Sequence, residues 1–179
     1  FLLLTAEFDN MRDGFVYGAL IGLGFTWFES ALYVTKGYVE FGTAPWGLQY
    51  GWRYALFGLS GHAMFTGILG AMLGVARQTT RTWVAIGAPI LGLLLAITAH
   101  MLNNILPLVA ALAGADHGTS PPVTQGPPPP VPFIDAWIAG SLSDLTVFLP
   151  FVVIMALVLW RSGRWERRVI REELEDEVG

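Results

Sequence analysis

Four long stretches of this chain carry almost no charged side chains. They are Gly14 to Thr35, Tyr54 to Ala76, Thr82 to Ala115 and Ala136 to Trp160, and their only charged residues are Glu29 and Asp144. A helix that crosses a membrane needs about 20 mostly apolar residues. We therefore expect four membrane-spanning helices at about residues 14–34, 52–76, 82–113 and 137–160, with Pro89 and Pro107 as points where the third could break.

The composition supports an all-α, polytopic transmembrane helix bundle in a lipid bilayer. Only 13% of the 179 residues are charged, against roughly a quarter in a typical soluble domain. A net charge of −4 argues against nucleic acid as a partner. The chain has no cysteine, which excludes disulfides, thiolate nucleophiles and cysteine metal ligands.

The distribution of basic residues predicts an orientation. On one side of the expected spans lie eight of the ten: Arg12, Arg77, Arg81, Arg161, Arg164, Arg167, Arg168 and Arg171. Loops rich in Arg and Lys face the cytoplasm, so we expect the C-terminus there. Lys36 and Arg53 fall on the opposite side, in a segment rich in the tyrosine and tryptophan typical of a membrane interface.

The expected organisation is a membrane core over residues 1–160 and a charged, helical cytoplasmic tail over 161–179. Residues 114–133 are rich in glycine and proline and indicate a stiff external loop. Phe1 to Thr5 is too short to span a membrane and resembles the end of an earlier helix. We therefore expect a fragment of a larger membrane domain.

Three ionisable residues inside the spans are functional candidates, because charge in hydrocarbon is costly. Counted from the cytoplasmic ends of their spans, Glu29, His62 and His100 lie at depths of about 24, 22 and 28 Å, at 1.5 Å per residue. Three different helices thus place them at one level, where they could meet. Asp144 could join them, although a hydrogen bond near Ser141 is the simpler interpretation.

The helix faces favour convergence. Glu29 shares a side with Gly18 and Gly22, which with Gly14 form a strip of small residues that allows close helix packing. Glu29 should therefore point towards protein rather than lipid. Asn104 lies one turn beyond His100 and could hydrogen-bond a neighbouring polar group.

One carboxylate and two imidazoles allow several chemistries. They suit a catalytic zinc site with an open position; without metal, Glu29 could act as a general base and the histidines could stabilise an oxyanion. Either arrangement hydrolyses an amide bond. A proton or ion transporter would also place Glu and His at mid-membrane, and each histidine alone could simply bridge helices.

The ordered motifs over residues 7–106 resemble the PrsW family of intramembrane proteases, which are related to the CAAX-processing and bacteriocin-immunity membrane proteases. The family's FxxxE motif falls on Phe25 and Glu29. Its HxxxS/T-like motif falls on His62 and Thr66, and its HxxxN motif on His100 and Asn104.

This resemblance implies an intramembrane metalloendopeptidase of the bacterial cell membrane. It would cut membrane-embedded or membrane-anchored proteins such as anti-sigma-factor-like regulators. Glu29 would bind or activate water, His62 and His100 would ligate a divalent metal, with zinc expected and Glu29 as a third ligand, and Asn104 would orient one of these groups.

Two features depart from the family pattern. The family's Glu-Glu motif would precede Phe1, and Ser30 stands where Asn is common. The alternative interpretation is a non-enzymatic membrane protein, either an ion- or proton-coupled transporter or an immunity-type binding module.

Overall fold

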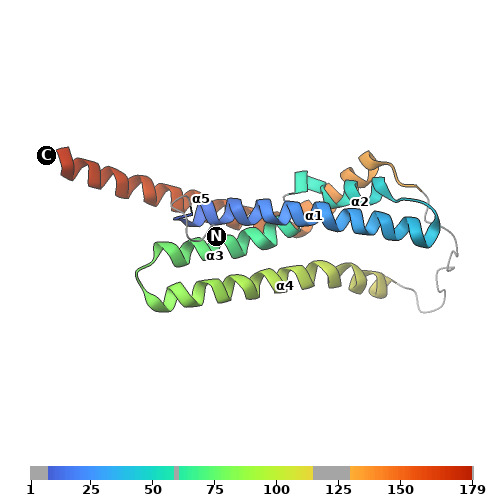
Figure 1. The fold of residues 1–179 in the computed structure, drawn as a ribbon, viewed down its shortest axis with the longest axis horizontal. Coiled ribbons are helices and arrows are strands. Elements are labelled where there is room, and N and C mark those ends of the chain that lie inside the picture. The colour runs from blue at the N-terminus through green and yellow to red at the C-terminus, as the bar shows by residue number, and fades with distance from the viewer. Residues whose placement is uncertain (1–7, 59–60, 115–129, 179) are drawn as a thin grey trace.

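The computed structural model describes residues 8–58, 61–114 and 130–178, and every regular element in these ranges is a helix (Figure 1). The elements are α1 (Met11–Phe41), α2 (Trp46–Arg53), the short 3₁₀ helix η2 (Ala55–Gly58), α3 (His62–Gln78), α4 (Thr82–Gly114) and α5 (Phe133–Val178). Within the described residues, three segments are long and apolar enough to cross a membrane: Met11–Phe41, Ala55–Gln78 and Thr82–Ile105. The all-helical membrane fold is confirmed.

Helices α1 and α3 pack through their backbones along a line of small residues, which we call the α1–α3 seam. A Cβ atom added at Gly14, Gly18 or Gly22 would run into the main-chain carbonyl of Gly70, Thr66 or His62, respectively. Such an approach is possible only without side chains on the α1 strip. The seam therefore fixes the lateral and axial position of α1 against α3.

The ends of α1 are set by local chemistry. The side chain of Asn10 accepts hydrogen bonds from the backbone N–H groups of Arg12 and Asp13, which satisfies free donors at the helix start. At the other end Gly42 adopts a left-handed conformation with φ of 71°, and its N–H donates to the carbonyl of Tyr38 at 2.8 Å. Glycine is the residue that accepts this conformation without strain.

The second expected span differs from the structure. Instead of one helix over 52–76, α2 ends at Arg53 and α3 begins at His62. Leu56 and Phe57 between them have left-handed backbones, with φ of 48° and 59°, which stops a right-handed helix. Contacts from α5 hold the break, because the Leu56 N–H donates to Ser141 Oγ at 3.1 Å.

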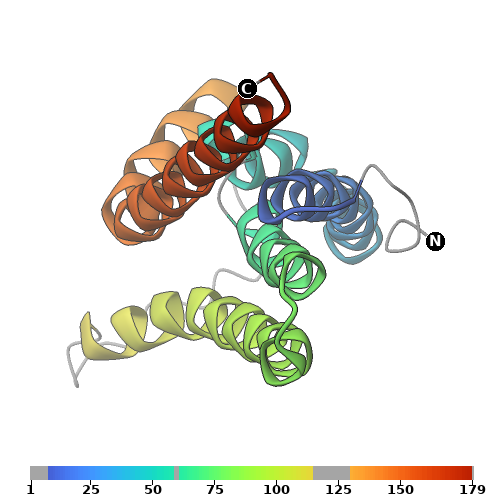
Figure 2. The same cartoon turned by 90° about the vertical axis from the view of Figure 1, so that its left-hand side faces the viewer.

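Helix α4 runs without interruption through both prolines that could have broken it, Pro89 and Pro107. It packs against α3, where Gly92 faces the side chain of Met72. In Figure 2 its later part diverges from the rest of the bundle.

Helix α5 contains the fourth expected span and the charged tail in one continuous element. Its 46 residues correspond to about 69 Å at 1.5 Å per residue, and its C-terminal part projects beyond the other helices (Figure 1). An ion pair of 3.5 Å joins Glu166 to Arg12 at the start of α1. The start of α1, the α3–α4 connection and the tail lie at one end of the molecule, as the positions of the arginines predict.

Two expectations lie outside what the structure describes. Residues 1–7 include the segment expected to end an earlier helix, and residues 115–129 make up most of the expected external loop. Asp144 belongs to α5, but its side chain is outside the described set.

Candidate active site

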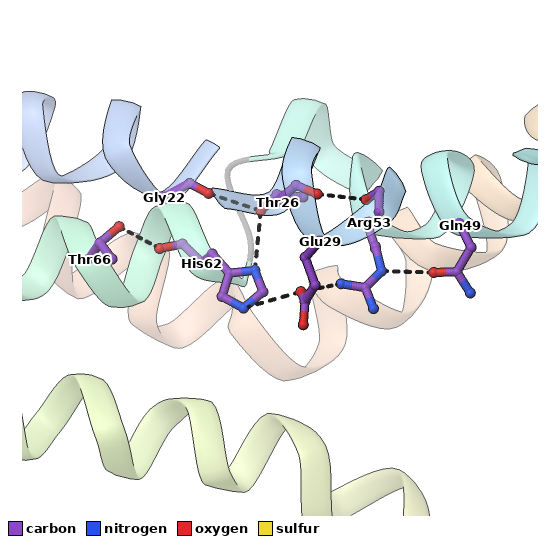
Figure 3. Close-up of polar contacts among 8 residues, drawn as sticks. Gly22, Thr26, Glu29, Gln49, Arg53, His62 and Thr66 are labelled. Carbon is purple, nitrogen blue, oxygen red and sulfur yellow. Dashed lines mark hydrogen bonds and ion pairs between the residues drawn. The ribbon is translucent and has the colours of Figure 1, made fainter. Parts of the chain in front are cut away.

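Glu29 and His62 face one another across the α1–α3 seam (Figure 3). Glu29 lies about five turns into α1, just beyond the glycine strip, and His62 is the first residue of α3. The Nε2 atom of His62 is 3.6 Å from Oε2 of Glu29. The close backbone packing of the two helices sets this approach.

Thr26 determines how the His62 ring is oriented. Its hydroxyl donates to the carbonyl of Gly22 at 3.0 Å and lies 3.2 Å from Nδ1 of His62. A hydroxyl has one proton, so when Thr26 donates to the carbonyl it accepts from Nδ1–H, and in that tautomer the free electron pair of the neutral ring is on Nε2. That Nε2 is buried and makes no hydrogen bond to any residue the structure describes.

His100 brings the second imidazole from α4. Its ring centroid is 5.0 Å from that of His62, with the planes at 73°, and 5.5 Å from the ring of Phe65, on which it stacks. Asn103 and Asn104 follow on the same helix and line the same cavity as His100.

Arg53 is a site residue that the motifs do not reveal. Its Nη1 lies 2.5 Å from Oε2 of Glu29, its Nε donates to Oε1 of Gln49 at 2.9 Å, and its guanidinium stands 4.5 Å from the centroid of the Tyr33 ring. A sequence signal for it exists: an acid inside a membrane requires a partner, and the side of the spans opposite the arginine-rich loops offers only Lys36 and Arg53.

These side chains surround one cavity of about 410 Å³ between four helices. Its lining residues are Thr26, Glu29, Tyr33, Leu48, Gln49, Trp52, Arg53, Gly61, His62, Phe65, His100, Asn103 and Asn104. All four residues predicted for the site, Glu29, His62, His100 and Asn104, are in this set. The predicted convergence of an acid and two imidazoles from separate spans is therefore observed.

Thr66, the second residue of the HxxxS/T-like motif, has a different position. Its Oγ1 lies 2.6 Å from the carbonyl oxygens of both Gly18 and His62. It therefore joins α1 to α3 in the seam and is not among the residues that line the cavity. Ser30 is fully buried and donates to the Thr26 carbonyl at 2.7 Å, so a small side chain fits there.

The chemical types of the donor atoms in the cavity suit a divalent metal. A carboxylate and imidazole nitrogens are accepted zinc ligands, and the buried Nε2 of His62, which makes no hydrogen bond within the described part of the chain, lies 3.6 Å from Oε2 of Glu29. Across the described residues, however, no three His, Cys, Asp or Glu side chains are gathered closely enough to hold an ion. Arg53 is the group that competes with a cation for Glu29.

The fold and the cavity define an integral membrane protein with a carboxylate- and imidazole-lined site inside its helix bundle. Comparison with known families agrees with this class and narrows it. The family model described as PrsW family intramembrane metalloprotease matches residues 1–123, and the chain belongs to this family.

Three curated relatives, each described as Protease PrsW, share 38–39% identity with the chain. The matches are 38% over 74 residues with the protein of Oceanobacillus iheyensis, 38% over 71 with that of Geobacillus kaustophilus and 39% over 72 with that of Bacillus subtilis. They cover 40–41% of this chain but only 28–30% of each relative. No solved structure matches.

Proposed function

We propose that this chain contains the active site of an intramembrane endopeptidase that hydrolyses peptide bonds of membrane-embedded or membrane-anchored proteins. The observation that carries the proposal is the single cavity in which Glu29, His62 and His100 meet from three helices. Anti-sigma-factor-like regulators are the substrate class suggested by the family. We place the C-terminus in the cytoplasm, because the arginine-rich end of the molecule should face it.

Glu29 is positioned to activate water. Its carboxylate lines the cavity and is held by Arg53 on one side and faces His62 on the other. We propose that Glu29 takes a proton from a water molecule as the water oxygen attacks the peptide carbonyl carbon. The proton then passes to the leaving amine as the C–N bond breaks.

The candidate ligands for a divalent metal, with zinc expected, are Glu29, His62 and His100, and these side chains would have to move closer together to hold it, because they are not gathered closely enough in this structure. When bound, such an ion lowers the pKa of its water and polarises the peptide carbonyl. In the tautomer in which Nδ1–H donates to Thr26, Nε2 of His62 would be available for ligation. Asn104, one turn beyond His100 at the cavity wall, would orient one of the reacting groups.

The first experiment replaces Glu29 by Gln in the full-length protein in membranes. The assay uses a panel of single-span membrane regulators with a tag at each end as cleavage reporters. Glu29→Gln should reduce cleavage by about 10²–10⁴-fold, the usual contribution of general acid–base catalysis. The control is Glu172→Gln, a change at an exposed residue of the tail, which should cleave as the wild type does.

Retained cleavage in Glu29→Gln would reject the catalytic role. Cleavage by neither protein, together with ion flux into liposomes, would favour a transporter instead.

The metal is tested separately by elemental analysis of the full-length, detergent-purified protein. The wild type should carry stoichiometric metal, and His62→Gln and His100→Gln should lose it. If the wild type is active without metal, the metal-dependent mechanism is rejected. The remaining mechanism is the one in which Glu29 acts as a general base and the imidazoles donate to the oxyanion.

A further inference from the structure

A second cavity of about 390 Å³ adjoins the candidate active site at the external end of the bundle. It lies between the last turns of α1, the 43–45 connection, α2 and the residues that precede α5. Tyr33, Leu48 and Gln49 line both cavities. The two spaces are therefore neighbours on either side of a shared wall.

The second cavity is mainly apolar. Phe41, Pro45, Leu48 and Val131 contribute apolar walls. The charged side chains among its described lining residues are Lys36 and Glu40, which are exposed and face each other at 3.7 Å. An apolar side chain would gain free energy from burial here, at about 25 cal/mol per Å².

Its walls are held in place by backbone packing. A Cβ atom at the buried Gly37 would meet the ring of Pro45, and one at Gly47 would run into the Val131 carbonyl. The last turn of α1, the connection after it and the start of α2 thus support one another. This rigidity suits a subsite that selects by size.

The position of the cavity along α1 gives its distance from the chemistry. Tyr33 is four and Phe41 twelve residues beyond Glu29, which corresponds to about 6 and 18 Å along the helix. An extended peptide advances about 3.3 Å per residue. A substrate segment lying along α1 would therefore reach this cavity with residues about two to five positions from the cleaved bond.

We propose that the second cavity is a specificity subsite for an apolar side chain of an extended substrate segment, two to five residues from the cleaved bond towards the external face. The inference rests on the proposed protease function and adds where the enzyme selects its substrate. The two cavities share lining residues, so their occupant should extend past Tyr33 and Gln49 to the charged groups of Glu29 and Arg53. A polypeptide has polar main-chain groups that suit this path, whereas an apolar lipid chain does not.

A size exchange between subsite and substrate tests this. In the full-length protein in phospholipid vesicles, Val131→Trp should lower kcat/KM about 10-fold or more, mainly through KM, for reporters with Leu or Phe at the selected position. Replacing that reporter residue by Ala should restore cleavage. The control Val39→Trp changes a residue of α1 that is 77% exposed and outside the cavity lining.

If the Val131→Trp variant cleaves every reporter as the wild type does, the proposed subsite is wrong, while the proposed protease function is unaffected. A loss that no smaller reporter residue repairs would also overturn the subsite.

A binding measurement keeps the inference testable without cleavage. In the Glu29→Gln background, a benzophenone amino acid at position 41 should crosslink to the tagged reporters, at residues two to five positions from the mapped or expected cleavage site. The same group at Val39 should not. Absence of reporter crosslinks at position 41, crosslinks to lipid alone, or equal yields at both positions would contradict the proposal.

Discussion

Helix α3 packs against α1 and against α4 in different ways. Towards α1, glycines meet main-chain carbonyls along the whole seam. Towards α4, a Cβ added at Gly92 would meet the Met72 side chain at 2.7 Å and the Leu69 Cα at 3.4 Å, with no main-chain carbonyl among these nearest atoms, and one added at Gly87 would meet nothing within 4 Å. In the apolar windows of the spans, 44% of residues are buried for the segment that contains α3, against 11% for α4.

The difference divides the candidate site into a fixed part and an adjustable part. Glu29 and His62 are carried by the two helices of the seam, and their separation is set by the backbone. His100 is carried by the helix with the weaker attachment, so its distance from the pair can change at lower cost. The acid and the first imidazole are preorganised, and the second imidazole is freer to move towards or away from them.

The largest effect is expected from the ion pair that secures α2 to the fixed part. Arg53→Met should lower the free energy of unfolding in detergent by about 2–3 kcal/mol. Removing one partner of a buried pair costs more, but Arg53 and Glu29 each keep 23% of their side-chain surface exposed. Thermal or chemical unfolding of the purified protein measures the loss.

The matched control for Arg53→Met is the same change in the Glu29→Gln background. In that background the loss of unfolding free energy should be clearly smaller, because no buried carboxylate is left without its positively charged partner. Equal losses in both backgrounds would mean that Arg53 stabilises through packing alone, for example on Tyr33.

The seam itself is tested by a single methyl group. Gly18→Ala places a Cβ against the Thr66 carbonyl, and overpacking of this kind costs about 1–3 kcal/mol. Gly24→Ala in the same helix adds the same atom where nothing lies within 4 Å. Both variants gain the same helix propensity, so the difference between their unfolding midpoints isolates the seam; equal midpoints would refute close packing there.

Much of this arrangement could be predicted from the sequence. The charge-free stretches locate the spans, and the constant rise of a helix places Glu29, His62 and His100 at one depth. The strip of Gly14, Gly18 and Gly22 identifies the side of α1 that packs on protein. These are local and periodic properties, which a sequence states directly.

The break between α2 and α3 could not be predicted in the same way. Leu56 and Phe57 take left-handed conformations next to contacts from α5, including the bond from Trp137 Nε1 to the Tyr54 carbonyl at 3.0 Å. Such long-range contacts leave no periodic trace in the sequence. The break positions α2, so the sequence narrows the partner of Glu29 to Lys36 or Arg53 but does not choose between them.

A smaller effect is expected from the hydroxyl that orients His62. Thr26→Val keeps the shape of the side chain but removes its bonds to Nδ1 of His62 and to the Gly22 carbonyl. The loss should be about 1 kcal/mol in stability and about 10–100-fold in metal affinity or activity, as for other groups that orient a ligand. Thr35→Val is the control, because that exposed hydroxyl donates to the Ala31 carbonyl of its own helix; equal activity losses would contradict the orienting role.

The smallest effect is expected on α4, and it tests whether the packing of this helix is as loose as the comparison with the α1–α3 seam implies. Gly87→Ala adds a methyl group to open space and should raise stability slightly, by no more than about 1 kcal/mol, because alanine favours the helix. The same unfolding measurement applies. A destabilisation as large as that of Gly18→Ala would show that this face of α4 packs tightly against protein rather than lipid. His100 would then be as firmly held as His62, and the division of the site into fixed and adjustable parts would have to be abandoned.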